Sequence, residues 1–193
     1  MLYVVTGGSG SGKSEYAENL AVSLGESRVY VATMQVFDEE DRKRVDRHRK
    51  LREGKQFVTI ECPLDLEQMV QENESEELSC ESVALLECMS NLLANEMFRP
   101  DFGFCSSGGG RNLQEKTAAE RILSGVERLQ KVCCHLVIVT NEVFSDGTVY
   151  EPETMEYIRC LGMLNRTLAS MADQVTEVVC GIPVIRKRKE VQL

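Results

Sequence analysis

The sequence lacks an excess of positive charge and long apolar runs, and both absences exclude classes of protein. Its net charge is −9 and its pI is about 4.9, so it has no basic field to hold a phosphate backbone, and we expect no nucleic-acid partner. No apolar run is long enough to span a bilayer, and Met1 is followed at once by the pattern of a core strand. We therefore expect a cytoplasmic protein, and the length of 193 residues predicts one domain, residues 1–193.

The cysteines lack the spacing of a metal site. There are eight of them, none in a C-x-x-C pair, and no secretory signal precedes them. A zinc site and a disulfide framework are therefore not predicted. We expect most of the cysteines to be small buried hydrophobic residues.

A glycine-rich segment follows the first apolar run. Residues 7–14 read G-G-S-G-S-G-K-S, which fits the pattern G-x-x-x-x-G-K-[ST], and they come directly after the apolar residues 2–6. A buried strand, a tight turn with inward N–H groups and a helix whose positive end faces the same point form a cradle for triphosphate. The alternative is a glycine- and serine-rich turn that matches by chance. The strand before it and the helical pattern after it favour the nucleotide site.

The predicted nucleotide site includes the whole segment: Gly7, Gly8, Ser9, Gly10, Ser11, Gly12, Lys13 and Ser14. We expect Lys13 to face solvent in the empty site and to reach the β and γ phosphates. The Ser14 hydroxyl would hold Mg²⁺.

Short β-branched apolar runs alternate with longer segments of helical period. We expect strands near residues 2–6, 28–32, 57–61, 82–86, 136–140, 174–179 and 184–187. We expect helices at residues 13–24, 38–52, 64–72, 89–98, 113–132 and 152–171. With the glycine-rich loop, this alternation predicts an α/β fold of the P-loop NTPase (RecA-like) class, with three layers and a mostly parallel central sheet. Residues 99–112 have no apolar period, which predicts a disordered loop or a lid that orders on binding.

Ligands of open α/β sheets bind at the carboxyl ends of the strands, so residues just after each strand are candidates. These are residues 33–35, Glu61, Glu87 and residues 140–142. Glu87 ends a buried run, where a nucleotide-binding protein of this class needs an acid to hold Mg²⁺. The alternative is an edge or helix-capping carboxylate.

The segment 38–52 begins with acidic residues and ends with basic ones, as a helix dipole prefers. Arg44, His48 and Arg52 are four residues apart, so in a helix they fall on one face. Cationic neighbours favour the neutral imidazole, whose lone pair can attack phosphorus. The alternative is a solvated basic helix with an incidental histidine. The other histidine, His135, precedes a buried strand and is expected to be structural.

Taken together, these residues resemble the bifunctional adenosylcobinamide kinase/adenosylcobinamide-phosphate guanylyltransferase family of cobalamin biosynthesis. The phosphate loop alone would fit many families. The motifs A-T-x-Q at 32–35, R-V-x-x-H at 44–48, L-L-E-C at 85–88 and T-N-E-V at 140–143 are specific in this order. The resemblance covers nearly the whole chain.

The resemblance implies two reactions, with Mg²⁺ as cofactor and GTP and ATP as nucleotide substrates. A γ-phosphate first moves to the aminopropanol hydroxyl of adenosylcobinamide. His48 then attacks the α-phosphorus of GTP, pyrophosphate leaves, and GMP passes to adenosylcobinamide phosphate. Nucleotide contacts outside the phosphate loop are implied at Thr33, Met34, Gln35, Arg44, Lys50, Arg52, Glu61 and Glu87. The family is also associated with a homotrimer whose active sites lie between subunits.

The chain departs from the family pattern mainly in its C-terminal half. Phe144 stands where the family has Gly, and Ile158-Arg159 stand where it has an Arg-Asp pair. Two other functions therefore compete with the bifunctional enzyme. One is a small-molecule kinase that transfers phosphate in line, for which His48 would be dispensable. The other is a GTP-binding sensor or assembly protein with a degraded acceptor site.

Overall fold

The computed structural model of the chain describes residues 1–36, 38–74, 76–99 and 116–189. In the helix over residues 39–52 it does not describe the side chains at positions 41, 44, 48 and 51. Residues 100–112, most of the predicted loop or lid, therefore lie outside the described residues.

Among the described residues, seven strands form one sheet in the order β3-β2-β4-β5-β1-β6-β7. Neighbouring strands are parallel from β3 to β6 in this order, and β7 pairs antiparallel with β6. The strands are β1 (Leu2–Thr6), β2 (Arg28–Ala32), β3 (Phe57–Glu61), β4 (Val83–Glu87), β5 (His135–Val139), β6 (Gln174–Val179) and β7 (Ile182–Arg188). The sheet is thus mostly parallel, as the alternating pattern predicts.

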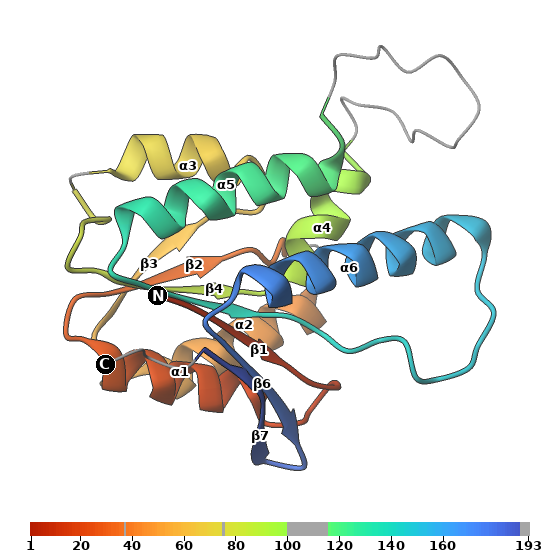
Figure 1. Cartoon of the computed structure of the whole chain (residues 1–193), viewed down its shortest axis with the longest axis horizontal. Coiled ribbons are helices and arrows are strands. Elements are labelled where there is room, and N and C mark those ends of the chain that lie inside the picture. The colour runs from red at the N-terminus through yellow and green to blue at the C-terminus, as the bar shows by residue number, and fades with distance from the viewer. Residues whose placement is uncertain (37, 75, 100–115, 190–193) are drawn as a thin grey trace.

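Helices cover both faces of the sheet and make three layers (Figure 1). The helices are α1 (Lys13–Leu24), α2 (Glu39–Arg52), α3 (Leu66–Asn73), α4 (Met89–Met97), α5 (Ala118–Val132) and α6 (Pro152–Met171). The larger core packs α3 to α6 against one face, with Leu86, Leu92 and Leu136 fully buried. The smaller core packs α1 against the other face. The predicted α/β, three-layer fold is confirmed.

The carboxyl ends of the central strands meet at one edge of the sheet. Ala32 pairs with Glu87, and Glu87 pairs with Val139. Val139 in turn pairs with Val5 near the end of β1. The register therefore brings the phosphate loop after β1 together with the residues that follow β2, β4 and β5.

Strand β7 begins two residues earlier than the apolar run predicts. Cys180 and Gly181 both have positive φ, at 51° and 80°, and they form the tight turn of a hairpin with β6. Pro183 lies within β7, an edge strand that pairs only with β6 among the described strands. No described strand lies along the outer edge of β7, so no ladder there needs the N–H that proline lacks.

The expectation that most cysteines are buried is wrong. Among the described residues, Cys62 and Cys133 are buried, Cys88 and Cys160 are half-buried against the two cores, and Cys80, Cys134 and Cys180 are exposed. Their spacing along the chain says nothing about which face of an element they occupy.

Candidate active site

The phosphate loop has the backbone conformation that its glycines permit. Gly10 and Gly12 have φ of 71° and 90°, a left-handed region that other residues rarely adopt. Gly7 needs space as well, because a Cβ there would lie 2.6 Å from the Val178 carbonyl oxygen. The Ser11 amide donates to the Gly8 carbonyl at 3.2 Å, which closes the turn just before α1 begins at Lys13.

Two other segments hold this loop in place. The Glu142 amide, just after β5, donates to the Gly7 carbonyl at 3.1 Å. The Gly181 amide in the β6–β7 turn donates to the Ser11 carbonyl at 2.8 Å. The loop is therefore fixed to the sheet on both of its sides, with Ser9 and Gly10 exposed at its tip.

Lys13 does not face solvent as expected. Its side chain folds back over the loop, where the ammonium donates to the Gly8 carbonyl at 3.1 Å, and the residue is only 8% exposed. Burial lowers the pKa of Lys13, and the neighbouring Cys88 and Glu87 oppose that shift. The structure thus brings Lys13 and Glu87 together at the mouth of the loop.

Glu87 is the last residue of β4 and is buried, with 8% of its surface exposed. Its Oε2 accepts a hydrogen bond from the Tyr30 hydroxyl at 3.1 Å. Ser14 lies half-buried in the first turn of α1. A carboxylate and a hydroxyl suit Mg²⁺, which binds through one or two protein groups together with phosphate oxygens and water. The described residues contain no cluster of three ligating side chains, and this mode of binding needs none.

Thr33 is fully buried and all of its polar groups are engaged. Its hydroxyl accepts from the Cys88 amide at 2.7 Å and donates to the Cys88 carbonyl at 2.8 Å. Its backbone amide donates to the Glu87 carbonyl at 3.1 Å. In this conformation Thr33 holds the end of β4 in place, while Met34 and Gln35 follow it and are half-buried.

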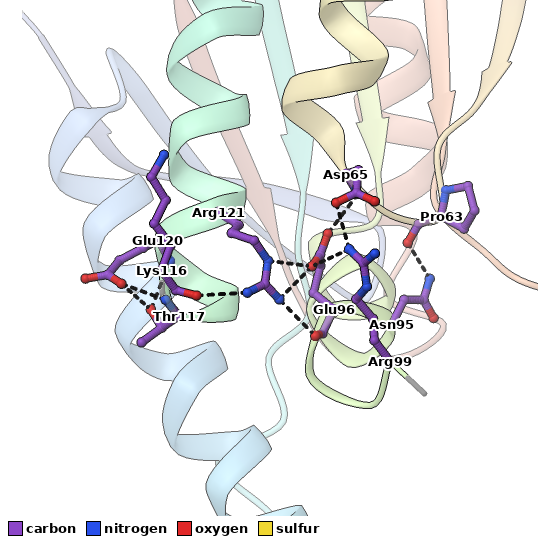
Figure 2. Close-up of polar contacts among 9 residues, drawn as sticks. All are labelled: Pro63, Asp65, Asn95, Glu96, Arg99, Lys116, Thr117, Glu120 and Arg121. Carbon is purple, nitrogen blue, oxygen red and sulfur yellow. Dashed lines mark hydrogen bonds and ion pairs between the residues drawn. The ribbon is translucent and has the colours of Figure 1, made fainter. Parts of the chain in front are cut away.

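Asn95 on α4 joins two loops that carry predicted site residues. Its side-chain amide donates to the Thr33 carbonyl and to the Pro63 carbonyl, both at 2.9 Å. Figure 2 shows the contact with Pro63. Pro63 follows Glu61, so one amide group ties together the loops after β2 and β3. Nothing in the sequence pattern singles out this asparagine.

Helix α2 runs without a break from Glu39 to Arg52, so positions 44, 48 and 52 follow one another at intervals of about one turn. Arg44 and His48 lie on this helix, and their side chains are outside the described part. Lys50 is exposed. The carboxylate of Glu61, itself exposed, lies 3.5 Å from the Arg49 guanidinium.

Arg52, the last residue of α2, is buried, with 8% exposure. Its guanidinium carbon lies 3.4 Å from the centre of the Tyr30 ring, and its Nη1 has no hydrogen-bond partner in the described structure. Tyr30 therefore contacts both residues: Arg52 lies over its ring, and Glu87 accepts from its hydroxyl.

A polar network follows β5, where residues 140–142 were predicted as candidates. The Thr140 hydroxyl donates to Asn165 Oδ1 at 2.6 Å, and the Asn165 amide donates to the Asn141 carbonyl at 3.2 Å. The Asn141 amide donates to the Ser90 hydroxyl at 2.7 Å. These contacts join α6 and α4 to the edge that holds Glu87, and sequence reasoning missed Ser90.

The two departures from the family pattern lie on the surface. Phe144 is 44% exposed, and its ring carbon lies 3.4 Å from where a Cβ on Gly162 would be. Arg159 is exposed and pairs with Glu156 one turn earlier on α6.

His135 is the first residue of β5, and its ring meets the Tyr3 ring edge-on at 6.0 Å. Burial lowers the pKa of His135.

Solved structures with related folds are ATPases of low sequence identity. One of them, an ATPase domain, has a TM-score of 0.52 at 8% identity, with 98% of this chain and 77% of that chain covered. An ATPase from the type III secretion system of pathogenic bacteria has a TM-score of 0.53 at 11% identity, with 96% and 56% covered. These likenesses concern the fold.

No described helix is both long and apolar enough to cross a membrane.

Sequence comparison gives closer relatives. The chain is 33% identical over 189 residues to the bifunctional adenosylcobalamin biosynthesis protein CobU of Escherichia coli, with 95% of this chain and 98% of that protein covered. CobU of Salmonella typhimurium is 32% identical over 193 residues, with the same coverage. CobP of Pseudomonas aeruginosa is 28% identical over 181 residues, with 94% of each covered. The family model of cobinamide kinase / cobinamide phosphate guanyltransferase matches residues 3–185, and the chain belongs to this family.

Proposed function

We propose that this chain phosphorylates the aminopropanol hydroxyl of adenosylcobinamide and then transfers GMP from GTP to the resulting phosphate. The observation that carries the proposal is one edge of the sheet where a phosphate loop, Lys13, Glu87 and the end of α2 come together. The family of the chain supports both reactions. We also propose that residues 1–193 act as a single domain, in a cytoplasmic homotrimer that binds no nucleic acid.

In the kinase reaction, the loop and Lys13 hold the nucleotide phosphates. The loop N–H groups and the Lys13 ammonium stabilise charge on the γ-phosphoryl group as the acceptor hydroxyl oxygen attacks phosphorus. The bond between the γ-phosphorus and the bridging oxygen breaks, the nucleoside diphosphate leaves, and the hydroxyl proton is released. Ser14 and Glu87 would hold Mg²⁺, which supplies charge neutralisation between the phosphates when bound.

In the second reaction, His48 is the nucleophile. An imidazole nitrogen attacks the α-phosphorus of GTP, the bond to the bridging oxygen breaks, and pyrophosphate leaves. A phosphate oxygen of the acceptor then attacks the same phosphorus and displaces His48. Arg44 and Arg52, one turn to either side of position 48, hold the phosphate charge. Further nucleotide contacts are proposed at Thr33, Met34, Gln35, Lys50 and Glu61.

Labelled GTP tests this function. We expect α-labelled but not γ-labelled GTP to mark the protein in the presence of Mg²⁺. A phosphoramidate is labile to mild acid and stable to base, so the mark should vanish in acid. His48→Asn should prevent labelling, whereas His135→Asn should not. Normal labelling of the His48 variant would contradict the covalent step and favour the simple kinase. GTP binding without labelling or phosphorylation of cobinamide would favour the sensor.

A further inference from the structure

Tyr30 contacts two groups of the site and belongs to neither of the predicted motifs that contain them. It lies in the middle of β2 and is 5% exposed. Its register partner on β4 is Leu85, yet its hydroxyl donates to Glu87, two residues further along that strand, at 3.1 Å. The ring thus reaches along the sheet towards the carboxyl edge, where a long aromatic side chain can contact a diagonal neighbour.

The other contact of Tyr30 attaches helix α2. The described side chains of this helix are exposed except for the half-buried Val45 and the buried Arg52. Among its described side chains only Val45 is apolar, so these side chains form no broad apolar face that could fix the helix on the sheet. Arg52, its last residue, stacks on the Tyr30 ring at 3.4 Å. A cation–π contact is stronger when the cation is removed from water, as the buried Arg52 is. Tyr30 therefore anchors the C-terminal end of α2.

We propose that Tyr30 is a positioning residue that sets the end of α2 relative to Glu87. Position 48 is one turn before Arg52, about 6 Å along the helix axis, so a shift of Arg52 moves the backbone of His48 as well. Through one side chain, the carboxylate on β4 and the helix that carries the nucleophile are held at a fixed separation. The inference deepens the proposed function and rests on it for the role of His48.

Two substitutions separate the contacts of Tyr30. Tyr30→Phe removes the hydrogen bond to Glu87 and keeps the ring under Arg52. Tyr30→Leu removes both contacts. The matched controls are Tyr3→Phe and Tyr3→Leu, because Tyr3 is also a strand tyrosine of the smaller core, is 8% exposed, and contacts Met1 and His135 instead of the site. General loss of packing appears in both series, whereas misplacement of α2 appears only at Tyr30.

The experiment measures the rate of labelling by α-labelled GTP, the affinity for GTP, and the hydrogen exchange of the α2 amides. We expect Tyr30→Phe to label about ten-fold more slowly with GTP affinity within about two-fold, since a hydrogen bond to a charged group is lost. Tyr30→Leu should in addition exchange the amides of residues 49–52 about ten-fold faster. Equal effects in the Tyr3 series, or unchanged exchange in Tyr30→Leu, would overturn the inference. If the wild-type protein is not labelled, the proposed function fails, and the exchange measurement still tests the anchor.

Discussion

The hydroxyl of Thr33 closes a two-way contact with the backbone of Cys88, accepting from its amide at 2.7 Å and donating to its carbonyl at 2.8 Å. The two residues are 55 positions apart, and the contact fixes the residue that follows Glu87. A threonine side chain is thus bound to the protein itself at a position where the family pattern implies a nucleotide contact.

Thr33→Val keeps the shape of the side chain and removes both hydrogen bonds. The Cys88 amide and carbonyl then lose a partner at a buried site, which costs about 1–3 kcal/mol of stability. Urea denaturation measures the loss. Thr59→Val on the exposed side of β3 is the control and should change stability by no more than about 0.5 kcal/mol. Equal stabilities of the two variants would show that the Cys88 contact is dispensable.

Lys13→Met should abolish triphosphate binding and raise the thermal stability of the nucleotide-free protein. Burial lowers the pKa of Lys13, so the unfolded chain holds this proton more tightly than the folded one. The buried charge of Lys13 therefore lowers the free energy of unfolding. This destabilisation is complete below the lowered pKa and disappears as the pH rises towards the ordinary pKa of lysine. The stability gap between variant and wild type should therefore narrow at alkaline pH. Lys131→Met, an exposed substitution on α5, serves as control. Unchanged nucleotide affinity in Lys13→Met would refute the role of Lys13.

Glu87→Gln should lower turnover far more than nucleotide affinity. The amide oxygen of glutamine can still accept from Tyr30, while the charge proposed to help hold Mg²⁺ is lost. EDTA should stop phosphoryl and guanylyl transfer alike in the wild-type protein. Steady-state rates and equilibrium binding of GTP give the comparison, with Glu127→Gln on the exposed side of α5 as control. A fully active Glu87→Gln protein would remove this residue from the site.

The sequence predicts those features of the fold that depend on neighbours along the chain. The strand at Leu2–Thr6 and the helix from Lys13 are marked by a local apolar pattern and by glycines, and both occur at the predicted bounds. The start of β7 is not predictable in this way, because it depends on a turn in which Cys180 takes a positive φ. A cysteine gives no such signal, whereas a glycine at that position would.

The same distinction separates the parts of the site. The phosphate loop and Glu87 are recognisable because each adjoins its own strand. The contacts of Tyr30 and Asn95 depend on pairs that are distant in sequence: Tyr30 meets Glu87 across 57 positions, and Asn95 meets Thr33 across 62. No spacing or period in one chain encodes such a pair, so these residues become visible only in the folded protein.

Glu96 gives the last prediction, which concerns stability rather than chemistry. Its carboxylate is 3% exposed and accepts from the Asp65 amide at 2.8 Å and from Arg121 Nε at 3.0 Å, with Arg99 Nη1 at 3.6 Å (Figure 2). It therefore joins the beginnings of α3 and α5 to the end of α4. Glu96→Gln leaves Arg121 facing a neutral side chain, whereas Arg99 keeps its pair with Asp65 at 2.7 Å. Loss of a hydrogen-bonded charged partner at a buried position costs about 1–3 kcal/mol.

Chemical denaturation of Glu96→Gln beside Glu156→Gln measures this cost. Glu156 also pairs with an arginine, Arg159, but both side chains are exposed, with 66% of Arg159 and 44% of Glu156 accessible. Exposed ion pairs contribute about 0–1 kcal/mol, because water and salt screen them. We therefore expect a lower denaturation midpoint for Glu96→Gln and almost no change for Glu156→Gln. Similar midpoints would mean that the hydrogen bonds to Glu96, which glutamine can partly replace, stabilise the three helices without its charge.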